Sequence, residues 1–108
     1  MNYSHLSKNY YHIEKAYHFG FFPKKQGKKQ QVLELIKATE DLTFIYYESP
    51  HRIQKTLKLM NDTIPEKNIV LAREITKKFE EFIRGTVKEV YNKVKDKKLK
   101  GEIVLLIH

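Results

Sequence analysis

Residues 42–52 read LTFIYYESPHR, and this stretch decides how the chain folds. Its first half, up to Tyr47, is apolar, β-branched or aromatic, which is typical of a β-strand covered on both faces. Ser49 and Pro50 then favour the start of a helix, because serine is a common N-cap and proline needs no N–H in the first turn. The stretch therefore predicts a buried strand that leads directly into a helix, with Glu48 at the joint.

The composition limits the class of protein. A chain of 108 residues is long enough for one domain with a modest core. Its 21 Lys and Arg against 13 Asp and Glu give a net charge of +8, which favours contact with polyanions, although such a surplus also serves solubility alone. No apolar run approaches the roughly 20 residues of a membrane span, and Met1–Lys8 lacks the apolar block of a signal peptide. With no Cys present, we expect a cytoplasmic protein that has no membrane association.

Hydrophobic periodicity and turn residues predict the remaining elements. Residues 1–16 are polar and are expected to form an N-terminal arm. The predicted elements are a strand at 17–22, a helix at 27–39, a strand at 42–47, a helix at 49–64, strands at 68–74 and 79–84 joined by a turn at 75–78, a helix at 86–94 and a strand at 102–107. Thr86 and Glu89 have the spacing of a capping box. This order predicts an α/β fold with an open mixed β-sheet and helices on its faces.

Several motifs of known chemistry are missing from the sequence. Gly27–Lys28 lacks the earlier glycine and the following Ser or Thr of a phosphate-binding loop. The five His are scattered, with no pair at the spacing of zinc ligands, so no metal site is expected. Neither a Cys nor a Gly-x-Ser-x-Gly elbow is available for acyl transfer.

The joint at Glu48–Arg52 is the strongest candidate site, because open α/β sheets bind ligands beyond the carboxyl ends of strands and beside helix N-termini. Ordinary helix capping also explains these residues. The basic run at 24–29 likewise has two interpretations, an RNA-backbone contact or a solvated helix start. Arg73–Glu74 and Glu80–Glu81 are expected to form cross-strand ion pairs in the hairpin.

Four stretches occur in an order and spacing that resemble one protein family. They are FGFFPKKQGKKQQ (19–31), FIYYESPHRIQKTL (44–57), VLAREITKKFEEFIRGTV (70–87) and KGEIVLLI (100–107). Together they resemble the C-terminal domain of the bacterial ribosomal RNA small-subunit methyltransferase I group, within the S-adenosylmethionine-dependent tetrapyrrole methylase superfamily. The resemblance covers about residues 17–107, and its combination of motifs is specific.

The resemblance implies the C-terminal lobe of a bilobal α/β enzyme that holds its cofactor between the lobes. Residues 17–108 match this lobe, residues 1–16 are atypical, and the N-terminal cofactor lobe with its glycine-rich loops is absent from a chain of four Gly. The complete enzyme would use S-adenosylmethionine to methylate the ribose 2′-hydroxyl of a cytidine in small-subunit ribosomal RNA. This chain alone is expected to be inactive and to bind the cofactor weakly or not at all.

The resemblance also implies partners and site residues. The expected partners are ribosomal RNA or the small ribosomal subunit, the missing lobe, and a second copy in a homodimer. The implied cofactor-binding residues are Phe22, Pro23, Tyr47, Glu48, Ser49 and Pro50. The implied RNA-binding residues are Lys24, Lys25, Lys28, Lys29, His51 and Arg52. No catalytic base is assigned.

Two other functions remain open. The first is a lobe of a methyltransferase that acts on a corrin or porphyrin, which would have no affinity for RNA. The second is a basic α/β module that binds RNA without catalysis. Binding of ribosomal RNA at several salt concentrations, and binding of S-adenosylmethionine, would separate these from the leading interpretation.

Overall fold

The computed structural model describes residues 16–17 and 20–108, so residues 1–15 of the expected arm and residues 18–19 of the first expected strand lie outside the described residues. The elements are β1 (Ala16–Tyr17), α2 (Gln26–Ala38), β2 (Thr43–Glu48), α3 (Ile53–Thr63), β3 (Asn68–Arg73), β4 (Glu81–Thr86), α4 (Val87–Val94) and β5 (Ile103–Ile107).

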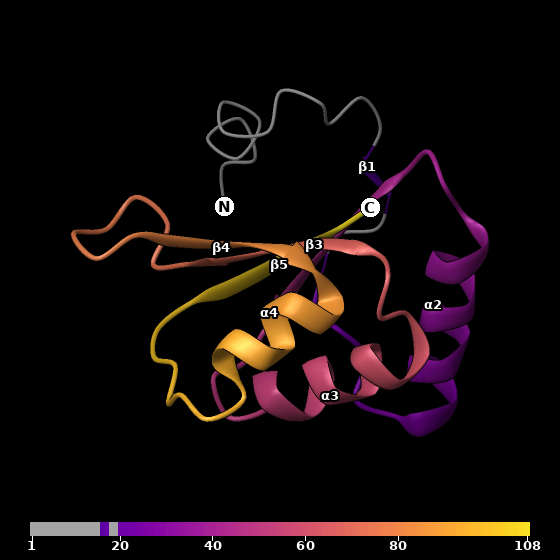
Figure 1. The fold of residues 1–108 in the computed structure, drawn as a ribbon, viewed down its shortest axis with the longest axis horizontal. Helices are drawn as coiled ribbons and strands as arrows, with labels where there is room; N and C mark the ends of the chain where they lie inside the picture. Colours follow the sequence, from indigo (N-terminus) through magenta and orange to yellow (C-terminus); the bar gives the residue numbers. More distant parts are fainter. Residues whose placement is uncertain (1–15, 18–19) are drawn as a thin grey trace.

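The described strands form one open sheet in the order β1-β2-β5-β3-β4 (Figure 1). β1 is parallel to β2, and every other neighbouring pair is antiparallel. The predicted open mixed sheet is therefore confirmed, as is the antiparallel β3–β4 hairpin. The central strand is β5, whose residues are all buried, as expected for its apolar sequence.

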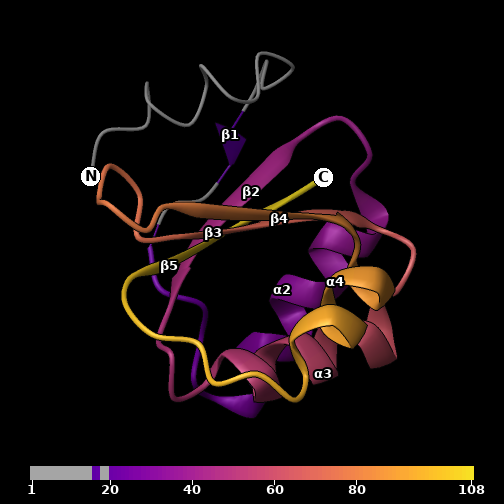
Figure 2. The same ribbon diagram turned by 60° about the vertical axis from the view of Figure 1, so that its left-hand side comes forward.

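The three described helices lie together on one face of the sheet, as both ribbon views show (Figures 1 and 2). Alternate strand residues point toward them, including Phe44, Leu71 and Leu105. The residues between these point to the opposite face, where Ile45 and Leu106 belong to a second buried cluster. The strands β2, β3 and β5 are thus apolar on both faces, as predicted for the run 42–47.

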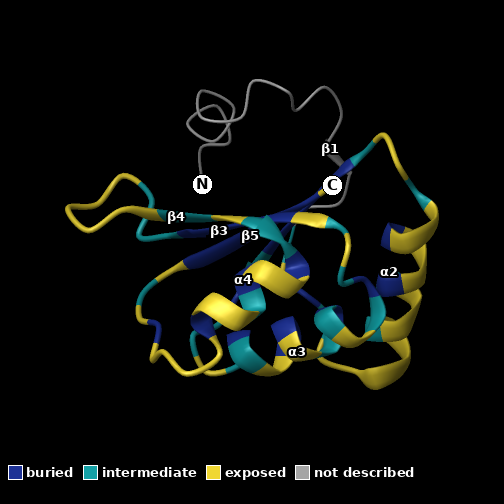
Figure 3. Cartoon of the chain, viewed as in Figure 1, coloured by how far each residue is buried: buried dark blue, intermediate teal, exposed yellow. Residues whose placement is uncertain are grey.

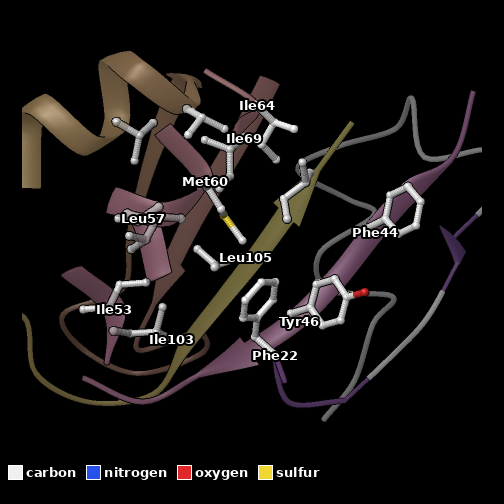
Figure 4. Packing of buried hydrophobic residues seen from close by; sticks show 14 of the residues in the cluster. Phe22, Phe44, Tyr46, Ile53, Leu57, Met60, Ile64, Ile69, Ile103 and Leu105 are labelled. Carbon is white, nitrogen blue, oxygen red and sulfur yellow. The ribbon is translucent and has the colours of Figure 1, made fainter. Parts of the chain in front are cut away.

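The main core lies between the sheet and the helices (Figure 4). Met60 of α3 points toward Leu105 of β5, so the helix packs directly on the central strand. On the β2 side, the rings of Phe22 and Tyr46 meet edge to face with their centroids 5.3 Å apart. Both rings are almost fully buried. This contact fixes the segment before α2 against the sheet.

One helix begins later than predicted. The helix expected from Ser49 starts at Ile53, because Ser49–Arg52 forms a separate tight turn. In that turn the Ser49 hydroxyl accepts a hydrogen bond from the His51 N–H at 3.0 Å, and the Ser49 carbonyl accepts one from the Arg52 N–H at 3.0 Å. A serine side chain stabilises a helix N-cap and a turn of this kind through similar bonds to nearby backbone N–H groups.

The hairpin connection is also longer than predicted. The strand expected at 79–84 lies at Glu81–Thr86, so the connection comprises residues 74–80 and not only 75–78. Glu74 and Thr76 have φ angles of 54° and 67°, in the left-handed region that few residues other than glycine adopt. Because neither residue is glycine, the sequence did not indicate a loop of this length.

The predicted capping box of α4 is confirmed. The Thr86 hydroxyl accepts from the Glu89 N–H at 3.2 Å, and the Glu89 carboxylate accepts from the Thr86 N–H at 2.8 Å. We expect Thr86→Ala to lower the free energy of unfolding by about 1 kcal/mol, because one N–H of the first turn loses its acceptor. Urea denaturation at neutral pH measures this loss.

The pH dependence of stability provides the control. The hydrogen bond from the Thr86 N–H is the main cause that lowers the pKa of Glu89 below its ordinary value of 4.5. The stabilisation is therefore present above pH 4.5 and is lost as pH falls through the lower pKa of the folded state. Glu89→Gln keeps an acceptor without the charge, so its stability should fall less than that of the unaltered chain over this acidic range. Equal acid dependence of the two would contradict the assignment.

Candidate functional site at the ends of β2 and β3

The strands β2 and β3 end at the same side of the sheet, where β5 begins. Glu48 at the end of β2 and Arg73 at the end of β3 both pair with Ile103, the first residue of β5. We call this side of the sheet the site end. The β2–α3 turn, the hairpin loop and the start of β5 all lie there (Figure 2). All four stretches that carry the family resemblance thus contribute residues to one region, which sequence spacing alone did not show.

The Glu48 carboxylate holds the β2–α3 turn together. Its Oε1 accepts hydrogen bonds from the Ser49 N–H at 2.7 Å and from the Arg52 Nε at 3.2 Å. Its Oε2 accepts from the Thr56 hydroxyl at 2.5 Å. The Glu48 side chain is only 1% exposed, whereas that of Arg52 is 33% exposed. Glu48 therefore uses both oxygens inside the protein and fixes the position of the turn.

The rest of the turn presents polar groups to solvent. Ser49 and Pro50 are half-buried, and His51 is exposed. The Arg52 guanidinium is half-buried beside Glu48, so its charge is partly balanced. Of the residues predicted here, Ser49, Pro50, His51 and Arg52 have surface available to a ligand, whereas Glu48 does not.

The two neighbouring phenylalanines at the site end have opposite surroundings. Phe22, a predicted cofactor contact, is 1% exposed and belongs to the core. Phe21 is 67% exposed, and its ring lies 5.6 Å from the ring of Tyr47. Pro23 and Tyr47 are half-buried. Phe21 was missed in the sequence, since two adjacent aromatic residues do not reveal which of them faces the core.

The predicted RNA-binding lysines surround the start of α2. Lys24, Lys25 and Lys28 are exposed and Lys29 is half-buried. Among the described residues, no side chain caps the N-terminus of α2, and its first turn contains no acidic residue. The same is true of α3. Free N–H groups and the helix dipole make both helix starts positive, which favours the binding of anions.

The hairpin loop is tied to the start of β5. The Lys77 Nζ lies 3.4 Å from Glu74 Oε2 and 3.2 Å from Glu102 Oε1. The hydrogen bond to Glu102 is the main cause that raises the pKa of Lys77 above its ordinary value of 10.5. Gly101, with φ of +85°, lies so close that a Cβ there would overlap the Glu74 carboxylate.

Arg73 also links the hairpin to the segment before β5, and it forms one of the predicted cross-strand ion pairs. Its Nε donates to Glu81 Oε1 at 3.0 Å, and its Nη1 donates to the Lys100 carbonyl. The Arg73–Glu81 pair is the expected cross-strand pair, since the two residues face each other in the register. Glu74 pairs with Lys77 inside the loop instead.

A hollow of about 340 Å³ lies elsewhere, at the C-terminal ends of α2 and α3. It is lined by Lys37, Glu40 and residues 63–67. The Lys67 ammonium donates to the Thr39 carbonyl at 2.7 Å and so satisfies a carbonyl just beyond α2. Because the candidate residues are at the opposite ends of these helices, this hollow is not part of the site end.

The described residues contain neither a cluster of metal ligands nor a membrane-spanning helix. No three His, Asp or Glu side chains in the described ranges gather as metal ligands would. No described helix is long and apolar enough to cross a bilayer.

Comparison with known proteins places this geometry in a family. No protein-family model matches the chain. It is 38% identical over 89 residues to the ribosomal RNA small subunit methyltransferase I of Bacillus subtilis (strain 168), and 39% identical over 88 residues to that of Halalkalibacterium halodurans. Each match covers 82% of this chain and 30% of the relative, so the chain spans less than a third of the length of these relatives.

The solved structures show the same fold. Cobalt precorrin-4 methyltransferase, a cobalamin biosynthetic enzyme, matches with a TM-score of 0.61 at 15% identity. The match covers 96% of this chain and 48% of that protein. At 15% identity this structural match shows only the fold. The family is shown by the sequence relatives. The chain therefore belongs to the ribosomal RNA small subunit methyltransferase I family, as one segment of it with the fold of a tetrapyrrole methylase.

Proposed function

We propose that the chain forms one wall of the cofactor cleft in an S-adenosylmethionine-dependent methyltransferase of small-subunit ribosomal RNA. We further propose that the methyl acceptor is the ribose 2′-hydroxyl of a cytidine, and that the remaining lobe comes from another segment or chain. The observation that carries this proposal is that the β2–α3 turn, the hairpin loop and the start of β5 lie at the site end, and that the segment before α2 joins the end of β2 through the bridge between Phe21 and Tyr47. The names of the sequence relatives support ribosomal RNA as the substrate.

The proposed cofactor wall consists of Pro23, Tyr47, Ser49 and Pro50. These residues are partly exposed on a turn that Glu48 holds rigidly, which suits a surface that must orient a bound molecule. When bound, S-adenosylmethionine supplies the methyl group. The four Gly of the chain are far apart in sequence, so no glycine-rich loop surrounds a ligand here. This supports a shared cleft, with weak or no cofactor binding by the chain alone.

Glu48 and Phe22 take indirect roles in this proposal. Because Glu48 is buried and fully engaged, we assign it the positioning of Ser49 and Pro50 and not contact with the cofactor. Phe22 supports Pro23 from the core. The one carboxylate of the β2–α3 turn is engaged inside the protein, so we do not assign it as the base for the 2′-hydroxyl proton.

The proposed RNA contacts are His51, Arg52 and the lysines around the start of α2. We call these lysines the α2 lysines; they are Lys24, Lys25, Lys28 and Lys29. The starts of α2 and α3 carry these positive side chains and no side-chain cap, which favours contact with phosphates at each helix start. In this setting the protein acts in the cytoplasm with the small ribosomal subunit, and a second copy in a homodimer would double the RNA surface.

RNA binding by the 108-residue chain tests the proposal. We expect affinity for a fragment of small-subunit ribosomal RNA to fall linearly in a plot of log affinity against log salt concentration. Replacing three α2 lysines with alanine should make this slope shallower by about 2, because each phosphate contact with single-stranded RNA contributes about 0.7. The lysines replaced are Lys24, Lys25 and Lys28, which are exposed. Fluorescence anisotropy at several salt concentrations measures the slope.

A matched variant controls for net charge. It replaces three exposed lysines away from the site end, namely Lys37, Lys58 and Lys88. Its slope should stay close to that of the unaltered chain. Negligible RNA binding by the unaltered chain would refute the proposed function and would leave the corrin or porphyrin alternative. If the slope became shallower by the same amount in both triple variants, the α2 lysines would not be specific RNA contacts.

A segment exchange tests the acceptor and the shared cleft together. Residues 17–108 would replace the matching segment of the Bacillus subtilis relative, and mass spectrometry would locate the methyl group on ribosomal RNA. Methylation of a cytidine ribose supports the proposal, whereas a methylated base contradicts it. Micromolar binding of S-adenosylmethionine to the chain alone in calorimetry would overturn the shared cleft, and RNA binding by an exchange protein without any methylation would favour a non-catalytic module.

A further inference from the structure

The hairpin loop carries an exposed ring that the proposed cofactor and RNA contacts do not use. Phe79 is 71% exposed, the largest fraction for a bulky apolar side chain in the described part of the chain. Figure 3 shows the hairpin loop largely in the colour of exposed residues. Its sequence neighbours in the loop, Lys77, Lys78 and Glu80, are polar and exposed. The Lys78 ammonium lies 5.6 Å from the ring centroid. A single aromatic ring among lysines suits a nucleic-acid base better than an apolar protein surface.

The loop that carries Phe79 has a fixed conformation. The Glu74 N–H donates to the Glu102 carbonyl at 3.0 Å, and the Lys77 N–H donates to the Glu74 carbonyl at 3.0 Å. The Thr76 N–H donates to Glu80 Oε1 at 2.9 Å. These bonds hold Glu74 and Thr76 in left-handed conformations that cost free energy unless the surroundings impose them. The loop is therefore ordered before binding, which reduces the entropy lost when a partner binds.

The charges beside the ring favour an anionic partner. The carboxylates of the loop and of the adjoining strand ends have partners within the protein: Glu74 and Glu102 pair with Lys77, Glu81 pairs with Arg73, and Glu80 accepts a hydrogen bond from the Thr76 N–H. A run of exposed lysines follows α4 and leads to the base of the loop, where the Lys100 carbonyl accepts from Arg73. Within residues 16–17 and 20–108, none of the lysines of this run forms an ion pair; they are Lys95, Lys97, Lys98 and Lys100.

We propose that the hairpin surface, defined as Lys78, Phe79, Lys97, Lys98 and Lys100, binds a single-stranded segment of the RNA substrate. Phe79 stacks on an unpaired base, and the lysines contact neighbouring phosphates. The hairpin loop and the connection from α4 to β5, which carry these residues, lie on the side of the molecule where β5 begins (Figures 1 and 2). The inference rests on the proposed function in requiring an RNA substrate, but it assigns a second contact that is separate from the α2 lysines.

Tryptophan fluorescence tests the stacking directly. The chain contains no Trp, so Phe79→Trp introduces a single indole that can be excited apart from the tyrosines. Single-stranded oligoribonucleotide should quench this fluorescence, whereas an RNA duplex of the same length should leave it nearly unchanged, because paired bases cannot stack on the ring. Leu35→Trp, at a site on α2 that is 44% exposed, is the control and should respond to neither RNA.

Affinity measurements separate stacking from charge. Phe79→Ala should weaken binding of single-stranded RNA by about 5- to 150-fold while the salt slope stays the same, because the ring contacts no phosphate. Replacing Lys97, Lys98 and Lys100 with alanine should make the slope shallower by about 2. Phe79→Tyr should restore most of the affinity, since a stacking surface remains.

The outcomes distinguish the two proposals. If the unaltered chain does not bind RNA at all, the proposed function fails and this inference fails with it. If RNA binds normally to Phe79→Ala and leaves Phe79→Trp unquenched, the inference alone is refuted. A fluorescence change in Phe79→Trp that depends on protein concentration and not on RNA would assign the surface to a second copy of the chain, and so would also overturn it.

Discussion

Glu48→Ala should lower the free energy of unfolding by about 2–3 kcal/mol, a large part of the roughly 5–15 kcal/mol expected for such a domain. The variant leaves the buried Thr56 hydroxyl and the Ser49 N–H without their acceptor. It also leaves the Arg52 guanidinium, which is 33% exposed, without a counterion; water can reach that group, so it adds less than a fully buried charge would. Urea denaturation of the 108-residue chain measures the loss.

Two milder variants show which bond matters. In Glu48→Gln the remaining oxygen can still accept from Ser49 and Arg52, and the new amide can donate to the Thr56 hydroxyl. We expect a loss of about 1 kcal/mol, from the weaker hydrogen bonds of a neutral acceptor. Thr56→Val removes a buried donor without removing the carboxylate, and should also cost about 1 kcal/mol.

The same series decides whether Glu48 contacts a ligand. A positioning role requires that stability and RNA affinity fall together in Glu48→Ala and that both largely recover in Glu48→Gln. If Glu48→Ala were as stable as the unaltered chain, the carboxylate would not be needed for the turn. The prediction that Glu48 contacts the cofactor directly would then be favoured, because stability would not explain the buried carboxylate.

The sequence predicted the elements of this fold well because each carried a local signal. The continuous apolar run at 42–47 specified a strand buried on both faces, and β2 is such a strand. The Thr86–Glu89 box placed the start of α4 because its two reciprocal bonds involve only neighbouring residues. Local hydrogen bonding and periodicity therefore sufficed for the type and order of the elements.

The sequence could not place features that depend on contacts between distant residues. The turn at Ser49 and a helix N-cap there have the same residue pattern, and the bonds from Thr56 and Arg52 to Glu48 favoured the turn. Which of Phe21 and Phe22 faces the core depends on the bridge between Phe21 and Tyr47. An amphipathic helix likewise does not reveal which face of the sheet it covers, and here all described helices share one.

The candidate site shows the same limit. Each motif could be read separately, but its meaning depended on Glu48 and Arg73 both pairing with Ile103, a register set by the antiparallel position of β5 between β2 and β3. The loop network of Glu74, Lys77 and Glu102 joins residues far apart in sequence for the same reason. The sequence likewise does not reveal exposure, because the 71% exposure of Phe79 depends on the conformation of the hairpin loop.

Leu105→Ala should have the largest effect on stability of any single change considered, a loss of about 3 kcal/mol. Leu105 is fully buried in the central strand, with Tyr46 and Leu71 opposite it on the two neighbouring strands. Met60 of α3 points toward it (Figure 4), so removal of its side chain opens a cavity that the sheet and the helix close only in part. For a chain of this size the melting temperature should fall by about 12–24 °C, which calorimetry measures.

Three comparisons show that the loss comes from packing between α3 and β5. Leu105→Met keeps the volume and should cost less than about 1.5 kcal/mol, while Leu35→Ala, at an exposed position of α2, should change stability by no more than about 0.5 kcal/mol. The double variant Leu105→Ala, Met60→Ala should lose less than the sum of the single losses, because both deletions enlarge one cavity. Additive losses would mean that the two side chains do not share a packing site, and the attachment of α3 to the central strand would then have to rest on the residues around Leu57.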